Sequence, residues 1–159
     1  MQISQNQINV MSLAEQDVII QNAIFILEQR IFRAGPFLTN PEDVKSYLRL
    51  QLANPVKEIF ACVFLDSHHR VIKYEPLFFG SIDHTTVHPR IILQRALETH
   101  SAAVIMAHNH PTGIVNPSVA DQRLTKRLKD LLIKIDVRLI DHFIIGEGEP
   151  YSFAEAGLI

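Results

Sequence analysis

Residues 102–121 read AAVIMAHNHPTGIVNPSVAD, and this stretch decides the fold. It opens with a short apolar run, which predicts a buried β-strand. A polar loop containing Pro111 and Gly113 follows. Ser118, preceded by Asn-Pro, marks the start of a helix. A buried strand followed by a loop and a helix is typical of an α/β sheet, in which ligands bind beyond the carboxyl ends of the strands.

Further strands are predicted on both sides of this stretch in the sequence. Residues 58–66 are almost continuously apolar, as expected of a central strand covered on both faces. A polar turn separates them from residues 70–79, which predicts a hairpin. Two later strands are expected at residues 137–145 and, as a short edge strand, within residues 151–159.

Helices alternate with these strands. Two amphipathic helices are predicted before the first strand, over residues 14–33 and from Pro41 onward. A third opens at Pro89, and a fourth follows Ser118. In the third helix, we expect the inward side chains to be Leu93, Ala96 and Leu97. The predicted fold class is therefore α/β, a mixed β-sheet sandwiched between helices.

The chain length of 159 residues suits one globular domain. We expect this domain to span residues 55–159 and to follow an N-terminal helical segment over residues 1–54. No apolar run approaches the ~20 residues that span a bilayer, and the start of the chain does not resemble a signal peptide. The single cysteine, Cys62, suits a reducing compartment. These features predict a cytoplasmic protein without membrane contact.

The charge balance argues against a general attraction to polyanions. Fifteen Lys and Arg oppose seventeen Asp and Glu, which gives a formal net charge of -2. Binding to nucleic acid would therefore need a local basic patch. One candidate is the helix after Ser118, whose basic residues are Arg123, Lys126, Arg127, Lys129 and Lys134. A solvated helix face is the simpler explanation of these residues, because the helix lacks interleaved aromatics for base stacking.

The densest group of potential metal ligands is His108, His110 and Asp121. Two histidines that are two residues apart in an extended segment point the same way, so both imidazoles can face one ion. Asp121 lies in the first turn of the following helix and can supply a third ligand. Three such ligands leave a fourth tetrahedral position for water, which is typical of a catalytic zinc site. We expect one Zn²⁺ per chain.

Hydrolysis at such a site also needs a proton acceptor and a donor to the oxyanion. Glu58, at the start of the predicted central strand, is the candidate general base, although its position alone does not separate it from Glu75 or Glu98. Ser118 is the candidate donor to the oxyanion. Ser118 is equally suited to capping the helix, and both roles are compatible.

Glu58 together with the string from His108 to Asp121 resembles the JAMM pattern, also called JAB or MPN+: a distant Glu, then H-x-H, seven residues and S-x-x-D. Within this group the chain is similar to the RadC-type JAB domain, and specifically to short prophage-associated RadC-like proteins. The similarity covers about residues 55–159. It includes Thr125-Lys126-Arg127-Leu128 and Asp141-His142.

The resemblance implies a fold like that of cytidine deaminases and a zinc-dependent hydrolase of peptide or isopeptide bonds. It implies zinc held by His108, His110 and Asp121, with Glu58 as general base and Ser118 steadying the tetrahedral intermediate. A peptide or protein substrate follows from this activity. The alternative is a non-catalytic or DNA-associated module, because the RadC branch carries a DNA-repair name. One departure is Ile91, where the family usually has Glu.

Two related interpretations are set aside, and two other histidines are retained. A zinc nucleoside deaminase needs several cysteine ligands, which Cys62 alone cannot supply. The letters H-N-H do not make an HNH nuclease, whose residues are spread over a longer motif. His88 and His142 are candidates for orienting a loop or a metal ligand, although a structural hydrogen bond is the simpler role.

Overall fold

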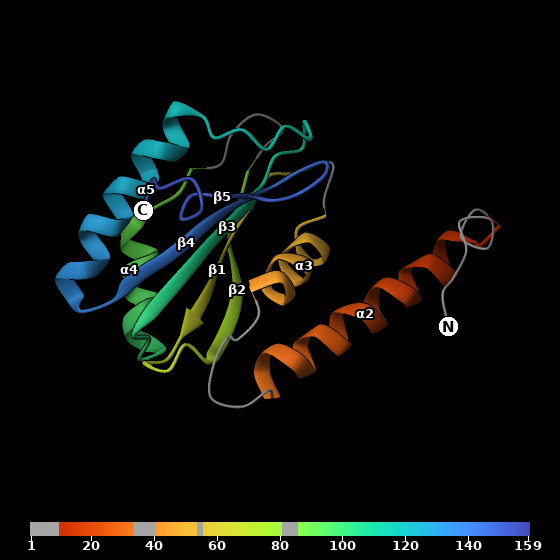
Figure 1. Ribbon diagram of the computed structural model, residues 1–159, viewed down its shortest axis with the longest axis horizontal. Coiled ribbons are helices and arrows are strands. Elements are labelled where there is room, and N and C mark those ends of the chain that lie inside the picture. The colour runs from red at the N-terminus through yellow and green to blue at the C-terminus, as the bar shows by residue number, and fades with distance from the viewer. Residues whose placement is uncertain (1–9, 34–40, 54–55, 81–85) are drawn as a thin grey trace.

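The computed structural model describes residues 10–33, 41–53, 56–80 and 86–159 (Figure 1). Helices and strands alternate along the chain, as the hydrophobic periodicity predicts. Their order is α2 (Leu13–Arg33), α3 (Pro41–Gln51), β1 (Ile59–Leu65), β2 (Val71–Phe79), α4 (Pro89–Glu98), β3 (Ala103–Asn109), α5 (Val119–Leu132), the short 3₁₀ helix η1 (Ile133–Ile135), β4 (Arg138–Ile145) and β5 (Tyr151–Ser152).

The five strands form one mixed sheet in the order β2-β1-β3-β4-β5. β1 pairs antiparallel with β2 and with β3, and this confirms the predicted hairpin. β3 and β4 are parallel, with α5 as the crossover between them. β5 adds the predicted short edge strand. The α/β prediction is therefore confirmed.

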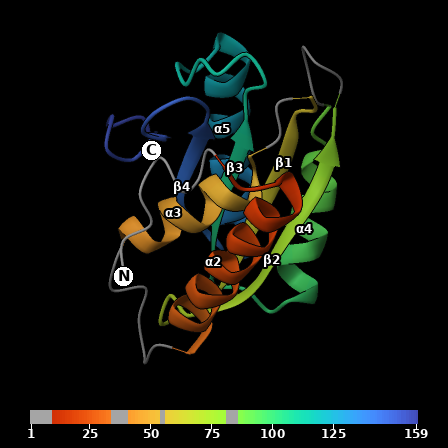
Figure 2. The same ribbon diagram turned by 90° about the vertical axis from the view of Figure 1, so that its right-hand side faces the viewer.

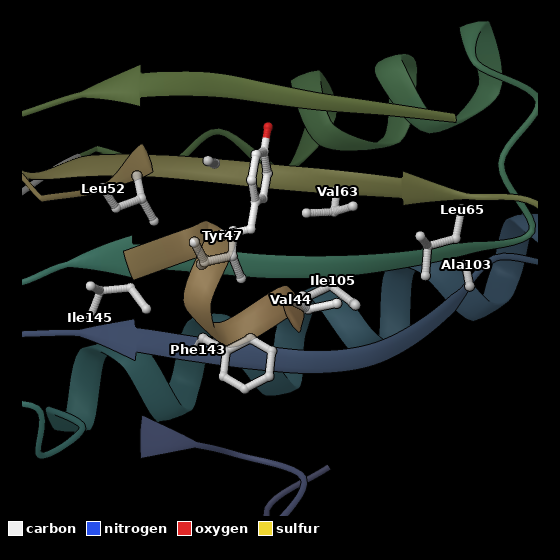
Figure 3. Close-up of a cluster of buried hydrophobic side chains, with 12 residues drawn as sticks. Val44, Tyr47, Leu52, Val63, Leu65, Ala103, Ile105, Phe143 and Ile145 are labelled. Atoms are coloured by element: carbon white, nitrogen blue, oxygen red, sulfur yellow. The ribbon is translucent and has the colours of Figure 1, made fainter. Parts of the chain in front are cut away.

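Helices cover both faces of the sheet (Figures 1 and 2). α2 and α3 lie on one side, and α4 and α5 lie on the other. Because side chains alternate across a strand, β1 and β3 feed two separate cores. Val63, Leu65 and Ile105 face α3 (Figure 3), whereas Cys62 and Met106 face α4 and α5.

The prediction of the inward side chains of α4 is wrong for one residue, Leu97. The side chains of Ile92 and Ala96 are fully buried, and Leu93 packs against the same core. Leu97, predicted to point inward, is 56% exposed. Leu93 and Leu97 both lie about 100° round the helix from Ile92 and Ala96, at the edge of the buried face. Leu93 is still partly covered there, whereas Leu97, next to the last residue of α4, is not.

A β-bulge in β4 sets which residues face α5 near the carboxyl end of the strand. Val104 pairs with Leu139, but the next residue, Ile105, pairs with Asp141, so Ile140 is the extra residue. A bulge shifts the inward and outward alternation by one position. As a result, His142 lies on the same face of the sheet as Leu139 and hydrogen-bonds to a residue of β3 on that face.

The predicted boundary between a helical segment and the domain falls at residues 54 and 55, which lie outside the described residues. The helix before it contributes to the sheet core, because Val44, Leu48 and Leu52 of the α3 region are buried in the cluster that faces β1 and β3. Within the described ranges, no helix combines the length and the apolar character needed to cross a bilayer.

Candidate metal centre

The two histidines of the H-N-H sequence lie at the carboxyl end of β3. The side chain of His108 is 1% exposed and faces α5, and Phe60 from β1 stacks against its imidazole at 6.0 Å between ring centroids. His110 follows the strand and is partly buried. The Nε2 atoms of the two rings are 3.0 Å apart. The strand alternation therefore brings both imidazoles to one point, as predicted.

The third predicted ligand is fixed by the start of α5. Ser118 is the N-cap, and its Oγ accepts from the backbone N–H of Asp121 at 3.1 Å. The Asp121 carboxylate accepts from the backbone N–H of Ser118 at 2.7 Å and from its hydroxyl at 2.6 Å, both at Oδ2. This reciprocal arrangement is a capping box. It holds Oδ2 and leaves Oδ1 directed at His108 Nε2, 3.4 Å away.

These side chains form a group suited to one metal ion. His108, His110 and Asp121 each offer one ligand atom, and the three atoms lie within 4.8 Å of one another. Two imidazoles and a carboxylate are nitrogen and oxygen donors of the kind that catalytic zinc sites use. The predicted ligand set is therefore brought together from β3, the loop after it and α5.

The protonation states of His108 and Asp121 also suit metal binding. Burial lowers the pKa of His108 to about 4, so its ring is neutral near pH 7. Burial acts to raise the pKa of Asp121, but hydrogen bonds from His110 and Ser118 outweigh it and hold that pKa well below its usual range. The Asp121 carboxylate in turn raises the pKa of His110. A divalent cation bound here would neutralise the negative charge of the Asp121 carboxylate in place of a proton on His110.

The loop between β3 and α5 orients His110. His110 Nδ1 donates to the carbonyl oxygen of Ile114 at 2.6 Å, which leaves Nε2 as the ligand atom. The loop is anchored to the end of β4, because the backbone N–H of Glu147 donates to the carbonyl of Gly113 at 2.8 Å. Glycine is required at position 146, since a Cβ atom there would lie 2.4 Å from the Gly113 oxygen.

Glu58 precedes β1 and lies near one of the candidate ligands, His110. Phe60 pairs with His108 in the antiparallel ladder of β1 and β3. The same register, continued by two residues, puts Glu58 opposite His110. The negative charge of Glu58 contributes to the raised pKa of His110. The two alternatives, Glu75 and Glu98, both form ion pairs with Arg95 of α4. Position therefore favours Glu58, and its role as general base stays a prediction.

Asn109, which the sequence analysis did not single out, holds the backbone on both sides of Glu58. Its Oδ1 accepts from the backbone N–H of Ile59 at 2.7 Å, and its Nδ2 donates to the carbonyl of Lys57 at 2.9 Å. Asn109 is 3% exposed and is the middle residue of H-N-H, on the opposite face of β3 from the two histidines. The sequence offers one signal for this role: Asn109 is a polar residue at a strand position whose side chain faces the apolar core under α3.

Two further residues support the buried histidine. His142 of β4 is fully buried, and its Nε2 lies 2.9 Å from His108 Nδ1. The hydroxyl of Thr125, in α5, lies 2.7 Å from His142 Nδ1. Of the two histidines proposed to orient a ligand, His142 therefore contacts one. The ring of His88 instead packs edge-on near Phe78, with centroids 6.1 Å apart.

A cleft of about 470 Å³ opens beside His110. Arg49 and Leu52, from α3 and the residue after it, line one wall, while Pro111 and Gly146 line the other. The lining is mostly apolar, and it includes the charged residues Arg49 and Glu147. Clefts of this size are typical of small-molecule and peptide-segment sites.

Comparison with known proteins finds a matching family model and several curated relatives. A family model described as "RadC-like JAB domain" matches residues 38–158. Three curated relatives all carry the designation UPF0758 in their names. One from Ectopseudomonas mendocina is 47% identical over 144 residues, which is 91% of this chain and 64% of the relative. Relatives from Stutzerimonas stutzeri and Pseudomonas fluorescens are 52% and 54% identical over 79% and 76% of this chain. The chain spans 54% to 64% of the length of these relatives.

Proposed function

This chain belongs to the RadC-like JAB domain family, and on that premise we propose that it is a zinc-dependent hydrolase of peptide or isopeptide bonds. The observation that carries the proposal is the convergence of His108, His110 and Asp121, whose ligand atoms lie within 4.8 Å of one another. The JAB family includes metallohydrolases, so the proposed chemistry suits both the family and the donor set.

The residues present fit a zinc ion. His108 and His110 would hold it through Nε2, because the Nδ1 atoms of both rings are engaged in other hydrogen bonds. Asp121 would hold it through Oδ1, since Ser118 occupies Oδ2. A bound zinc ion supplies Lewis acidity that activates water and polarises the amide carbonyl.

The protein side chains would handle the proton and orient the substrate. The Glu58 carboxylate would take a proton from the attacking water and deliver it to the leaving amine, as a general base and then a general acid. The Ser118 hydroxyl donates to Asp121 in this structure, so it orients a ligand directly. To donate to the substrate oxyanion, the same hydroxyl would first have to give up its hydrogen bond to Asp121. The cleft beside His110 would hold a segment of the substrate peptide.

Metal analysis and a substrate screen test the proposal. Native protein, purified without chelators, is expected to hold about one zinc per chain, and Asp121→Ala is expected to lose it. His68→Ala is the matched control, because His68 is exposed in the turn between β1 and β2. Glu58→Gln is expected to keep zinc but to lower hydrolysis of the best peptide or isopeptide substrate by about 10²- to 10⁴-fold. Native protein without zinc, or Glu58→Gln with full activity, would overturn the proposal.

Association with nucleic acid is a second candidate, supported by the exposed basic face of α5. Arg123, Lys126 and Arg127 are all exposed, directly after the ligand Asp121. Binding through this face would weaken steeply with salt, because phosphate contacts release counterions. Titration of a labelled DNA duplex at two salt concentrations, with native protein and with Arg123→Ala/Arg127→Ala, decides it. Binding that the double substitution leaves unchanged would exclude this face.

A further inference from the structure

A continuous chain of buried hydrogen bonds joins two of the proposed metal ligands through residues that are not themselves ligands. It begins at the backbone carbonyl of Asp121, which accepts from Thr125 Oγ1 at 2.7 Å. Thr125 Oγ1 is 2.7 Å from His142 Nδ1, and His142 Nε2 is 2.9 Å from His108 Nδ1. The side chains of Thr125, His142 and His108 are at most 1% exposed.

The direction of every bond in this chain follows from its first member. A backbone carbonyl has no hydrogen, so the Thr125 hydroxyl donates its single hydrogen to Asp121. The Thr125 oxygen must then accept from His142, whose Nδ1 carries the proton. A second proton on His142 would create a fully buried cation with another imidazole beside it, which is costly. His142 Nε2 therefore accepts, and His108 Nδ1 donates to it.

The consequence falls on the ligand atom of His108. A neutral imidazole has one proton, so a proton on Nδ1 leaves the lone pair on Nε2, the atom that faces His110 and Asp121. The ring planes are held independently by packing. His142 stacks on Phe153 with centroids 4.8 Å apart, and His108 stacks on Phe60. Packing thus sets the orientation of the rings, and the hydrogen bonds select the tautomer.

We propose that Thr125 and His142 are positioning residues that lock His108 in the tautomer whose Nε2 can bind a metal ion. This inference rests on the proposed function for its biological meaning, but the tautomer itself is a property of the metal-free protein. Outer hydrogen bonds of this kind usually change metal affinity 10- to 100-fold. The same series of hydrogen bonds connects His108 to α5, the helix that carries Asp121. It therefore fixes the positions of the two candidate ligands relative to each other.

Two variants of one residue separate tautomer control from a general packing role. Thr125→Val keeps the shape of the side chain and removes the hydroxyl, whereas Thr125→Ser keeps the hydroxyl and loses a methyl group. Thr125→Val is expected to weaken Zn²⁺ binding at least tenfold in competition with a chromophoric chelator. Thr125→Ser is expected to remain within threefold of native protein, although it loses more packing.

Nitrogen-15 NMR of the histidine rings in metal-free protein near pH 7.5 gives the second measurement. The native spectrum is expected to show His108 and His142 as neutral rings protonated at Nδ1, and Thr125→Val is expected to shift both toward a mixture. A native His108 protonated at Nε2, or equal zinc affinities for native protein and Thr125→Val, would overturn the inference. If native protein binds no zinc, the proposed function fails, while the tautomers in the spectrum still decide the positioning role.

Discussion

Removal of the Asn109 side chain should lower turnover, through the proposed proton transfer by Glu58, and leave metal binding unchanged. Asn109 makes two hydrogen bonds to the backbone on either side of Glu58, and its side chain faces away from His108 and His110. Asn109→Ala deletes both bonds without touching a ligand atom. We expect the segment that carries Glu58 to lose its fixed position while the metal centre stays intact.

The magnitude follows from the two bonds and their surroundings. Each hydrogen bond contributes about 1 kcal/mol to stability, and a buried group left without a partner costs about 1–3 kcal/mol. Lys57 is exposed, so water can replace that partner, whereas Ile59 is partly buried at the start of the central strand. We therefore expect Asn109→Ala to lower the free energy of unfolding by about 2–3 kcal/mol.

Urea denaturation of the metal-free protein measures the loss of stability, and chelator competition measures zinc affinity. Asn116→Ala, in the exposed loop before α5, is the matched control and should change stability by less than about 0.5 kcal/mol. Zinc affinity should stay within about threefold of native, while turnover falls at least tenfold, because the proposed proton transfer depends on the position of Glu58. A stability loss below about 0.5 kcal/mol, or zinc affinity lost in step with turnover, would refute this account of Asn109.

Two further outcomes follow from close packing elsewhere. Gly146→Ala should lower the free energy of unfolding by about 2–3 kcal/mol, because its Cβ would overlap the Gly113 carbonyl. Gly148→Ala is the comparison in thermal denaturation, since a Cβ at this position meets nothing within 4 Å. Its φ of 82° alone should lower the free energy of unfolding by about 1 kcal/mol. Equal losses for the two variants would contradict the overlap at Gly146. The thiol of Cys62 is fully buried, and burial raises its pKa, so a thiol reagent should label native protein only at the rate of unfolding. Rapid labelling without denaturant would show that the strand is accessible.

Local patterns were sufficient to predict most of the fold. The apolar run over residues 58–66 predicts β1, and the turn after it predicts the hairpin with β2, because both signals depend on neighbours in the sequence. The H-x-H spacing predicts that His108 and His110 converge, since side chains two apart share a strand face. Ser118 and Asp121 form the expected cap, which is also a short-range arrangement.

The features that the sequence analysis missed depend on contacts between distant segments. The phase of α4 is set by packing on the sheet, so periodicity alone wrongly placed Leu97 in the core. The side chain of Asn109 meets a strand about fifty residues earlier in the chain. The contact of His142 with His108 depends on the bulge at Ile140, which no residue preference in β4 announces.

The parallel crossover β3-α5-β4 contains all three candidate ligands and the two residues that position His108, within residues 108–142. Glu58 is the exception, because it enters from the antiparallel half of the sheet. The proposed metal binding and the proposed proton transfer would thus depend on separate stretches of the gene. One substitution at the start of β1 would then remove the proposed hydrolysis and leave the crossover with its candidate ligands intact, so metal content and turnover should be scored separately when members of this family are compared.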